Sequence, residues 1–258
     1  MNNPIGIFDS GIGGISILEK LENVLPIENF IYLADNVNCP YGDKSKEEII
    51  KFSLKNCEKL IELNCKIIIV ACNTATTNSI NFLRDKISIP IIGIEPGLKP
   101  AIIHTKTKNI GVLATEQTLD SNLFFETLVK NKIEDIKIHE QIGFNIVKMI
   151  ENEETDENKL YDILKNYLTP MLDKNIDCLV LGCTHYHYLI NTIKEIIPTS
   201  VKVIDTITPV ANQTIKIIKL NNLMKKSNEK RYVKVFFNGN SLSRKFIGDD
   251  YEIRYLKF

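Results

Sequence analysis

The chain has 258 residues, of which 44% are apolar and 25% are charged, and these proportions are typical of a globular protein. This length allows one large domain or two of modest size. Lys and Arg together number 32, as do Asp and Glu, so the formal net charge is zero. Because the chain has no surplus of basic residues to neutralise phosphates, nucleic acid is not expected as a partner.

Short apolar segments rich in β-branched residues alternate along the chain with longer segments of helical periodicity. This alternation is typical of an α/β protein with mainly parallel sheets. The predicted strands are residues 5–8, 30–33, 67–71, 89–93, 110–113, 136–139, 178–181, 201–204 and 232–237. No apolar run approaches the roughly 20 residues of a membrane-spanning helix, so no membrane association is expected.

Two of the helical segments have clear boundaries. Ser45 and Glu48 have the spacing of a capping box, and apolar side chains recur on one face, so a helix is predicted over residues 45–63. Residues 152–158 are polar and precede a second amphipathic helix, predicted over residues 160–172. We interpret the polar stretch as a surface connection and not as a linker between domains.

An internal repeat is visible in the strands. The segment Ile67-Ile68-Ile69-Val70-Ala71-Cys72-Asn73-Thr74 matches Cys178-Leu179-Val180-Leu181-Gly182-Cys183-Thr184-His185, and Ile5-Gly6-Ile7-Phe8-Asp9-Ser10 parallels Ile110-Gly111-Val112-Leu113-Ala114-Thr115. The repeat predicts two similar α/β domains: residues 1–95 with 209–258, carrying Cys72, and residues 96–208, carrying Cys183. Ligands bind beyond the carboxyl ends of parallel strands, so two facing halves would bring both cysteines into one cleft.

Six cysteines are scattered along the chain. The start Met1-Asn2-Asn3-Pro4 lacks the basic residues of a signal peptide, so we expect reduced thiols in the cytoplasm. Cys72 and Cys183 each follow a strand end and precede a predicted helix, where the helix dipole and free amides lower the pKa of a thiol. Their equivalent positions favour catalysis. The others are interpreted as packing residues: Cys39, Cys57, Cys65 and Cys178.

The segment Ser10-Gly11-Ile12-Gly13-Gly14 follows Asp9 at the end of the first strand. Its glycines would let backbone amides approach a carboxylate closely, although a simple tight turn is the alternative. It is not a dinucleotide fingerprint, because Ser16 stands where the third glycine would be.

His185 lies two residues after Cys183 and could exchange a proton near neutral pH. The alternative is a metal site with Cys183 and His187, but no four-ligand zinc set is complete, and residues two apart on a helix diverge. We expect neither a metal nor another cofactor.

Four separated motifs occur in the order found in glutamate racemases. They are Phe8-Asp9-Ser10-Gly11-Ile12-Gly13-Gly14, Pro40-Tyr41-Gly42, Ala71-Cys72-Asn73-Thr74-Ala75 and Gly182-Cys183-Thr184-His185-Tyr186. Through them the chain, from about Ile5 to Asp205, resembles the glutamate racemases of the aspartate/glutamate racemase superfamily. The resemblance implies two pseudo-symmetric α/β domains and a cofactor-independent isomerase that supplies D-glutamate for peptidoglycan in a bacterial cytoplasm. It leaves open whether the protein forms a homodimer.

The resemblance also assigns roles to individual residues. It implies that Cys72 and Cys183 exchange the α-proton, with help from Asp9 and His185, while Glu151 and Thr115 are candidates for a supporting role. The implied substrate contacts are Asp9, Ser10, Tyr41, Gly42, Asn73, Thr74, Thr184 and His185.

The chain departs from the family pattern in its second half. Where many relatives have a Cys-Pro pair and a Val-Pro-Leu-Ile-Glu run, it has Gly143-Phe144 and Ile146-Val147-Lys148-Met149-Ile150-Glu151. Glu151 keeps the acidic position, but the changed context leaves its role open. His187 stands where proline is common, so the start of the following helix is expected to differ locally.

Three other functions compete with this interpretation. A sister racemase acting on aspartate is the nearest, although aspartate racemases tend to carry Glu at the position of His185. A cysteine hydrolase with Cys183 as nucleophile would leave Cys72 unexplained. A two-lobed binding protein of the periplasmic type would carry a signal sequence.

Overall fold

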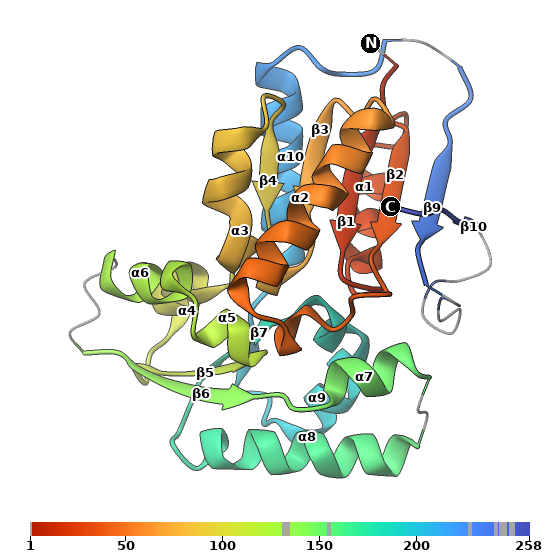
Figure 1. Cartoon of the computed structure of the whole chain (residues 1–258). Coiled ribbons are helices and arrows are strands. Elements are labelled where there is room, and N and C mark those ends of the chain that lie inside the picture. The colour runs from red at the N-terminus through yellow and green to blue at the C-terminus, as the bar shows by residue number, and fades with distance from the viewer. Residues whose placement is uncertain are drawn as a thin grey trace.

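The computed structural model describes residues 2–130, 135–153, 156–226, 229–239, 242, 247 and 251–258, with the side chains of 128–130 left aside. Within these residues the strands form two sheets, in the orders β10-β9-β2-β1-β3-β4 and β6-β5-β7-β8. Every strand pair is parallel. The predicted α/β class with mainly parallel sheets is therefore confirmed. Figure 1 shows the two sheets in separate layers, each flanked by its own helices.

The first sheet draws on both ends of the chain. Its strands are β1 (Ile5–Asp9), β2 (Phe30–Ala34), β3 (Ile67–Val70), β4 (Ile91–Gly93), β9 (Val233–Phe237) and β10 (Glu252–Tyr255). Its helices are α1 (Ile15–Val24), α2 (Lys46–Glu62), α3 (Asn73–Lys86) and α10 (Ile207–Leu220), with a 3-10 turn η1 (Tyr41–Asp43). Because α10 contacts α1 and β4, the C-terminal part of the chain returns to the sheet formed by its start.

The second sheet is built from the middle of the chain. Its strands are β5 (Asn109–Ala114), β6 (Lys137–Ile142), β7 (Cys178–Gly182) and β8 (Lys202–Val203). The helical segments around it are α4 (Leu98–His104), α5 (Glu116–Leu119), α6 (Asn122–Lys130), α7 (Ile146–Glu151), α8 (Glu157–Leu172), η2 (Thr184–Leu189) and α9 (Ile190–Ile196). The domain boundaries at 95/96 and 208/209 stay a prediction.

Strand register confirms the internal repeat. In the first sheet Ile5 pairs with Ile67, and in the second sheet Ile110 pairs with Cys178. These are the residues that the sequence repeat aligns with one another. The four-strand orders β2-β1-β3-β4 and β6-β5-β7-β8 are also equivalent. The cysteines that follow β3 and β7 therefore occupy matching positions beside the central strands β1 and β5.

Capping side chains mark the starts of the two helices that the sequence delimited. The capping box of α2 is present, since the Ser45 side chain accepts from the Glu48 amide and Glu48 accepts from the Ser45 amide. Helix α8 begins before the predicted residue 160, because the Asp156 side chain caps it by accepting from the Lys159 amide at 3.1 Å. The predicted polar break is correspondingly shorter, and its residues 154 and 155 lie outside the described residues.

Strand β10 was not predicted. It is charged at Glu252 and Arg254 and mostly exposed at the edge of the sheet, so it lacks the buried apolar pattern by which a strand is recognised. The other strands were predicted with shifted ends: β4 begins at Ile91 and not at 89, and β8 covers only Lys202–Val203.

The carboxyl ends of the first sheet face the second sheet. In Figure 1 the arrowheads of β1 and β2 point toward the layer that contains β5 and β6. The loops that follow these strand ends therefore lie between the layers. Among the described residues, no helix is both long and apolar enough to cross a bilayer.

Candidate active site

The loop between β1 and α1 passes very close to α7 and η2, two helical segments beside the second sheet. A Cβ atom at Gly11 would lie 1.8 Å from Glu151 Oε1, and one at Gly13 would lie 2.5 Å from His185 Nδ1. Any side chain at these positions would collide, so the glycines permit the approach of the two layers. The amide of Ile12 completes the contact by donating to Glu151 Oε1 at 2.8 Å.

Asp9 ends β1 and is fully buried. Its Oδ1 accepts from the Gly11 amide at 3.1 Å and from Ser10 Oγ at 3.2 Å, and its Oδ2 accepts from Thr184 Oγ1 at 2.8 Å. Burial raises the pKa of Asp9, while the charge of His185 and the hydrogen bonds from Thr184 and Gly11 oppose that rise. Asp9 thus joins the loop after β1 to the residue that follows Cys183.

Cys72 is buried at the N-cap position of α3. The amide of Ala75 donates to its Sγ at 3.4 Å, and Ser10 Oγ lies 3.9 Å from the same sulphur. The expected lowering of the thiol pKa is wrong for this residue. Burial and the neighbouring charge of Asp9 raise the pKa of Cys72 in spite of the Ala75 amide, because desolvation of a thiolate outweighs one donated hydrogen bond.

Cys183 follows β7 in the equivalent position but has a different environment. The segment after it, η2, is a 3-10 helix, and the Cys183 side chain caps no amide. The expected helix N-terminus beside this thiol is therefore the start of a 3-10 helix, and the α-helix α9 begins only at Ile190. The neighbour of the thiol is instead His185, whose Nδ1 lies 3.8 Å from Cys183 Sγ.

His185 connects Cys183 to Glu151. Its Nε2 lies 2.6 Å from Glu151 Oε1, and the histidine side chain is 2% exposed. Burial alone would lower the pKa of His185, but the contacts with Cys183 and Glu151 and the charge of Glu151 raise it well above its ordinary value. These contacts favour the imidazolium form of His185, with one ring nitrogen directed at a thiol and the other at a carboxylate.

His187 lies apart from this chain of contacts. Its Nε2 is 3.1 Å from Thr206 Oγ1, and burial lowers its pKa to about 4. The alternative metal cluster of Cys183, His185 and His187 is therefore not formed, because the two histidine side chains diverge as expected for residues two apart.

Thr74 and Thr115 link the two layers on the other side of the site. Thr74 Oγ1 lies 2.8 Å from Thr115 Oγ1 and 3.2 Å from Thr118 Oγ1. Asn73, which follows Cys72, is 2% exposed. Both ends of its side-chain amide are buried without a hydrogen-bond partner among the described residues. Such a group is costly unless a ligand supplies the missing partners.

Tyr41 and Gly42 lie at the edge of the same region. The Tyr41 hydroxyl donates to Asp35 Oδ2 at 2.5 Å and accepts from Asn56 Nδ2 at 3.0 Å, so it is fixed in a buried network. Gly42 is close to Thr115, and both line a cavity of about 200 Å³. Lys148 lines the same cavity and forms an ion pair with Asp43 at 2.7 Å, which joins η1 to α7.

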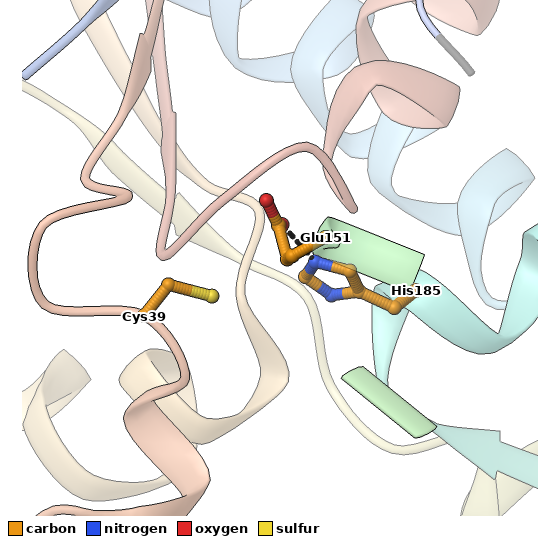
Figure 2. A group of neighbouring side chains, drawn as sticks. All are labelled: Cys39, Glu151 and His185. Carbon is orange, nitrogen blue, oxygen red and sulfur yellow. Dashed lines mark hydrogen bonds and ion pairs between the residues drawn. The ribbon is translucent and has the colours of Figure 1, made fainter. Parts of the chain in front are cut away.

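Cys39 was interpreted as a packing residue, and the structure changes this interpretation. Its Sγ lies 4.0 Å from Ser10 Oγ, and it belongs to a group of potential metal ligands with Glu151 and His185. Figure 2 shows its thiol near the Glu151–His185 pair. No sequence signal identified this position, because Cys39 lies in a loop far along the chain from Glu151 and His185. The remaining cysteines of the packing group are buried: Cys57, Cys65 and Cys178.

The arrangement suits proton transfer at a carbon atom. Two thiols on equivalent strand ends lie near enough for Cys183 to affect the pKa of Cys72. Between them are the buried carboxylate of Asp9, the hydroxyls of Ser10 and Thr184, and the imidazole of His185. Thiols, a carboxylate and an imidazole are the groups that act as acids and bases in enzymes.

Comparisons with known proteins agree with this chemistry. The model of the Asp/Glu/Hydantoin racemase family matches residues 11–214. The glutamate racemase of Ralstonia pickettii is 46% identical over 203 residues, which cover 79% of this chain and 72% of that protein.

Solved structures give the same result at the level of the fold. The crystal structure of a glutamate racemase isoform from Bacillus anthracis superimposes with a TM-score of 0.88 at 31% identity, covering 99% of this chain and 97% of that one. The glutamate racemase of Francisella tularensis, in complex with D-glutamate, superimposes with a TM-score of 0.87 at 29% identity, covering 99% and 98%. The chain is therefore an isomerase that belongs to the Asp/Glu/hydantoin racemase family and, within it, to the glutamate racemases.

Proposed function

We propose that the chain interconverts L-glutamate and D-glutamate by proton transfer between the substrate's α-carbon and the thiols of Cys72 and Cys183. One observation carries the proposal: the two thiols follow equivalent strands and meet at one buried group of hydrogen bonds. Ser10 Oγ is 3.9 Å from Cys72 Sγ, and Thr184, next to Cys183, donates to Asp9 at 2.8 Å. A substrate at this group would have one thiol on each face.

In each turnover one sulphur gains a proton and the other sulphur loses one. One cysteine, as a thiolate, takes the α-proton, so that the C–H bond breaks, an S–H bond forms and the electron pair remains on the α-carbon. The opposite thiol then gives its proton to the other face, which forms a new C–H bond with inverted configuration. The sulphurs end with exchanged protonation states, and the reverse reaction restores them. This is general acid and base catalysis by two groups on opposite faces.

The substrate itself supplies the charge that a thiolate requires. Burial and Asp9 raise the pKa of Cys72 in the free site, so the thiolate there is disfavoured. The α-ammonium group of a bound amino acid brings a positive charge into this buried and acidic region, which favours the thiolate. On the other face the His185 imidazolium, 3.8 Å from Cys183 Sγ, can donate to that sulphur when it carries the charge.

Polar groups near the thiols are suited to bind the carboxylates of glutamate. The amide of Asn73, which has no hydrogen-bond partner among the described residues, and the hydroxyl of Thr74 offer donors in a buried environment, where they also stabilise charge that develops on the α-carboxylate. Ser10 and Thr184 donate their hydroxyl protons to Asp9, so they offer oxygen acceptors to the α-ammonium group. Because the Tyr41 hydroxyl is engaged with Asp35, Tyr41 and Gly42 would contact the substrate through their main chain.

The similarity to glutamate racemases is the reason for proposing glutamate, and not aspartate, as the substrate. The similar enzyme of Francisella tularensis was solved with D-glutamate bound, and the similar enzyme of Ralstonia pickettii is a glutamate racemase. D-Glutamate formed in the cytoplasm would serve peptidoglycan synthesis, as the family resemblance implies. Growth of a bacterial strain that requires D-glutamate should therefore be restored by this gene, and a Cys72→Ala copy should fail to restore it.

Deuterium incorporation tests the two-thiol reaction directly. In deuterium oxide each enantiomer should gain one solvent deuterium as it becomes product, while the unconverted substrate initially stays protiated. A single shared base would label both pools together. Cys72→Ala and Cys183→Ala should each stop racemisation, measured by optical rotation with L-glutamate, D-glutamate and L-aspartate in separate assays. Racemisation near the wild-type rate in either variant would contradict the proposal.

Metal removal tests the expectation that no cofactor takes part. The enzyme should keep full activity after dialysis against a chelator, because the proposed proton transfers use only the protein's own groups. Activity that disappears with the chelator and returns with zinc would contradict this expectation.

A further inference from the structure

Cys39, Glu151 and His185 come from three separate segments and meet beside the thiol site. Cys39 lies in the loop between β2 and η1, Glu151 ends α7, and His185 lies in η2. One ligand atom of each, a sulphur, a carboxylate oxygen and an imidazole nitrogen, lies within 4.8 Å of the other two. Figure 2 shows the Cys39 thiol pointing toward Glu151 and His185, which a dashed line joins. Thiolate, imidazole and carboxylate are the ligands that zinc takes in proteins.

The group is accessible from outside. A cavity of about 430 Å³ is lined by Cys39 and Glu151 but not by His185, whose side chain is 2% exposed. Lys148 also lines this cavity, but its ammonium group is paired with Asp43 at 2.7 Å. A hydrated cation can therefore reach the first two ligands from solvent and the third after losing water.

Charges of both signs surround the group: the carboxylates of Glu151 and Asp9 attract a dication, and the charge of His185 opposes it. Burial raises the pKa of the Cys39 thiol well above its ordinary value, and the charges of Glu151 and Asp9 raise it further. The same carboxylates that oppose a thiolate attract a divalent cation, which can then displace the thiol proton into solvent. The hydroxyl oxygen of Ser10 lies 4.0 Å from the Cys39 sulphur.

We propose that Cys39 Sγ, Glu151 Oε1 and His185 Nε2 form an inhibitory site for Zn²⁺. Zinc bonds of about 2.0–2.3 Å place tetrahedral ligand atoms roughly 3.5 Å apart. The Glu151–His185 separation of 2.6 Å must therefore widen by about 1 Å, and the thiol must move inward. Three protein ligands leave the fourth position open to water, as in other zinc sites of this ligand number.

The inhibitory effect rests on the proposed function, whereas the binding does not. Zinc at Nε2 replaces the hydrogen bond to Glu151 and prevents that nitrogen from binding a proton. The widening of the Glu151–His185 contact also displaces the imidazole ring, whose Nδ1 lies 3.8 Å from Cys183 Sγ, from its position beside that thiol.

Cobalt measures the binding without reference to activity. Co²⁺ added to the wild-type protein should give a thiolate-to-cobalt charge-transfer band and intense tetrahedral d–d bands, and Zn²⁺ should remove both. The charge-transfer band should be lost in Cys39→Ala and kept in the matched controls Cys72→Ala and Cys183→Ala. A band that persists in Cys39→Ala, or that disappears with Cys72 or Cys183, would overturn the site.

Zinc inhibition supplies the second measurement. Cys39→Ala should racemise glutamate like the wild type but require at least about tenfold more zinc for half inhibition, because one of three protein ligands is gone. A chelator should restore wild-type activity. Inhibition that is equal in the two proteins would overturn the proposal. If Co²⁺ binds at Cys39 without any inhibition by zinc, the link through His185 is wrong while the site itself stands.

Discussion

The ionisable side chains around Cys72 and Cys183 are buried, and burial disfavours their charged forms. It raises the pKa of both Asp9 and Cys72. His185 is the exception, because the contacts with Cys183 and Glu151 outweigh its desolvation. Burial thus favours the thiol form of Cys72, and the contacts of His185 favour its imidazolium form. In the proposed mechanism the α-ammonium group of the substrate shifts Cys72 toward the thiolate.

Glu151, whose role the sequence left open, lies where it can position His185. Its Oε1 is 2.6 Å from His185 Nε2 and accepts from the Ile12 amide at 2.8 Å. In Glu151→Gln the pKa of His185 should fall, because a neutral amide no longer favours the imidazolium, and NMR titration of the imidazole measures this. Turnover should decrease by less than the roughly 10²–10⁴-fold that a positioned acid or base contributes. A loss equal to that of Cys72→Ala in a folded protein would show that Glu151 has a more direct role.

Asn73 offers a test that separates function from stability. Its amide is buried and has no hydrogen-bond partner at either end among the described residues, so the folded protein bears a desolvation cost of about 1–3 kcal/mol for such a group. Asn73→Ala should leave the thermal unfolding midpoint unchanged or higher, while kcat/KM falls for both enantiomers. Ser79→Ala is a matched control, because Ser79 on the same helix donates to the Ala75 carbonyl at 2.6 Å. A variant that loses stability and keeps its activity would place Asn73 in the core and not in the substrate site.

At the scale of elements, the two halves share a plan but differ at the cysteines. Cys72 caps an α-helix through the Ala75 amide, whereas Cys183 precedes a 3-10 helix and caps nothing. The equivalent strand ends are dictated by the parallel sheet register. The different helical segments that follow give the two thiols different neighbours, so they are not interchangeable chemically even though their backbone positions match.

The capping box of α2 predicts a measurable loss of stability far from the thiols. Ser45 is exposed, and its hydroxyl accepts from the Glu48 amide at 3.3 Å. Ser45→Ala should lower the free energy of unfolding by about 1 kcal/mol, and Ser45→Gly by only a few tenths, measured by urea denaturation. Racemase activity should be unchanged in both variants. Equal destabilisation by Ala and Gly would mean that the hydroxyl does not stabilise the helix.

At the scale of the whole molecule, polar contacts hold the two layers together around the site. They are Thr184 with Asp9, Thr74 with Thr115, and Lys148 with Asp43, at 2.7–2.8 Å. The first two are buried and the ion pair is half exposed, so a change in ionic strength should act mainly on the last. The site is thus formed by the closure of one layer on the other.

His187 makes the stability of the fold sensitive to acid. It contacts Thr206, immediately before α10, and burial lowers its pKa from 6.5 to about 4. Between these two pH values the unfolded chain binds a proton that the folded chain excludes, so stability falls as the pH decreases through this window. The loss should approach about 3 kcal/mol at low pH. Urea denaturation at about pH 7 and about pH 5 should show a smaller decrease for His187→Gln than for the wild type. Equal decreases would assign the acid sensitivity to other groups.

The sequence by itself was enough to locate most of the strands, the internal repeat and the four motifs. An apolar run, a capping box and the end of a strand are each encoded by a few consecutive residues. They can therefore be recognised in the sequence without knowledge of tertiary contacts. This is why the capping box at Ser45, the repeat of the strands and the equivalence of Cys72 with Cys183 were predictable. The edge strand β10 was not, because its exposed and charged residues carry no such pattern.

Only the tertiary structure decided how the side chains of the site meet. Glu151 contacts His185 across a separation of 34 residues in the sequence. Cys39 approaches both of these residues and is further from each in the sequence. The pKa of Cys72 likewise depends on how deeply the thiol is buried and on the position of Asp9, and neither is a property of its own segment. Desolvation and charge interactions are set by three-dimensional packing, so the helix N-terminus that the sequence indicated was not enough to decide the state of the thiol.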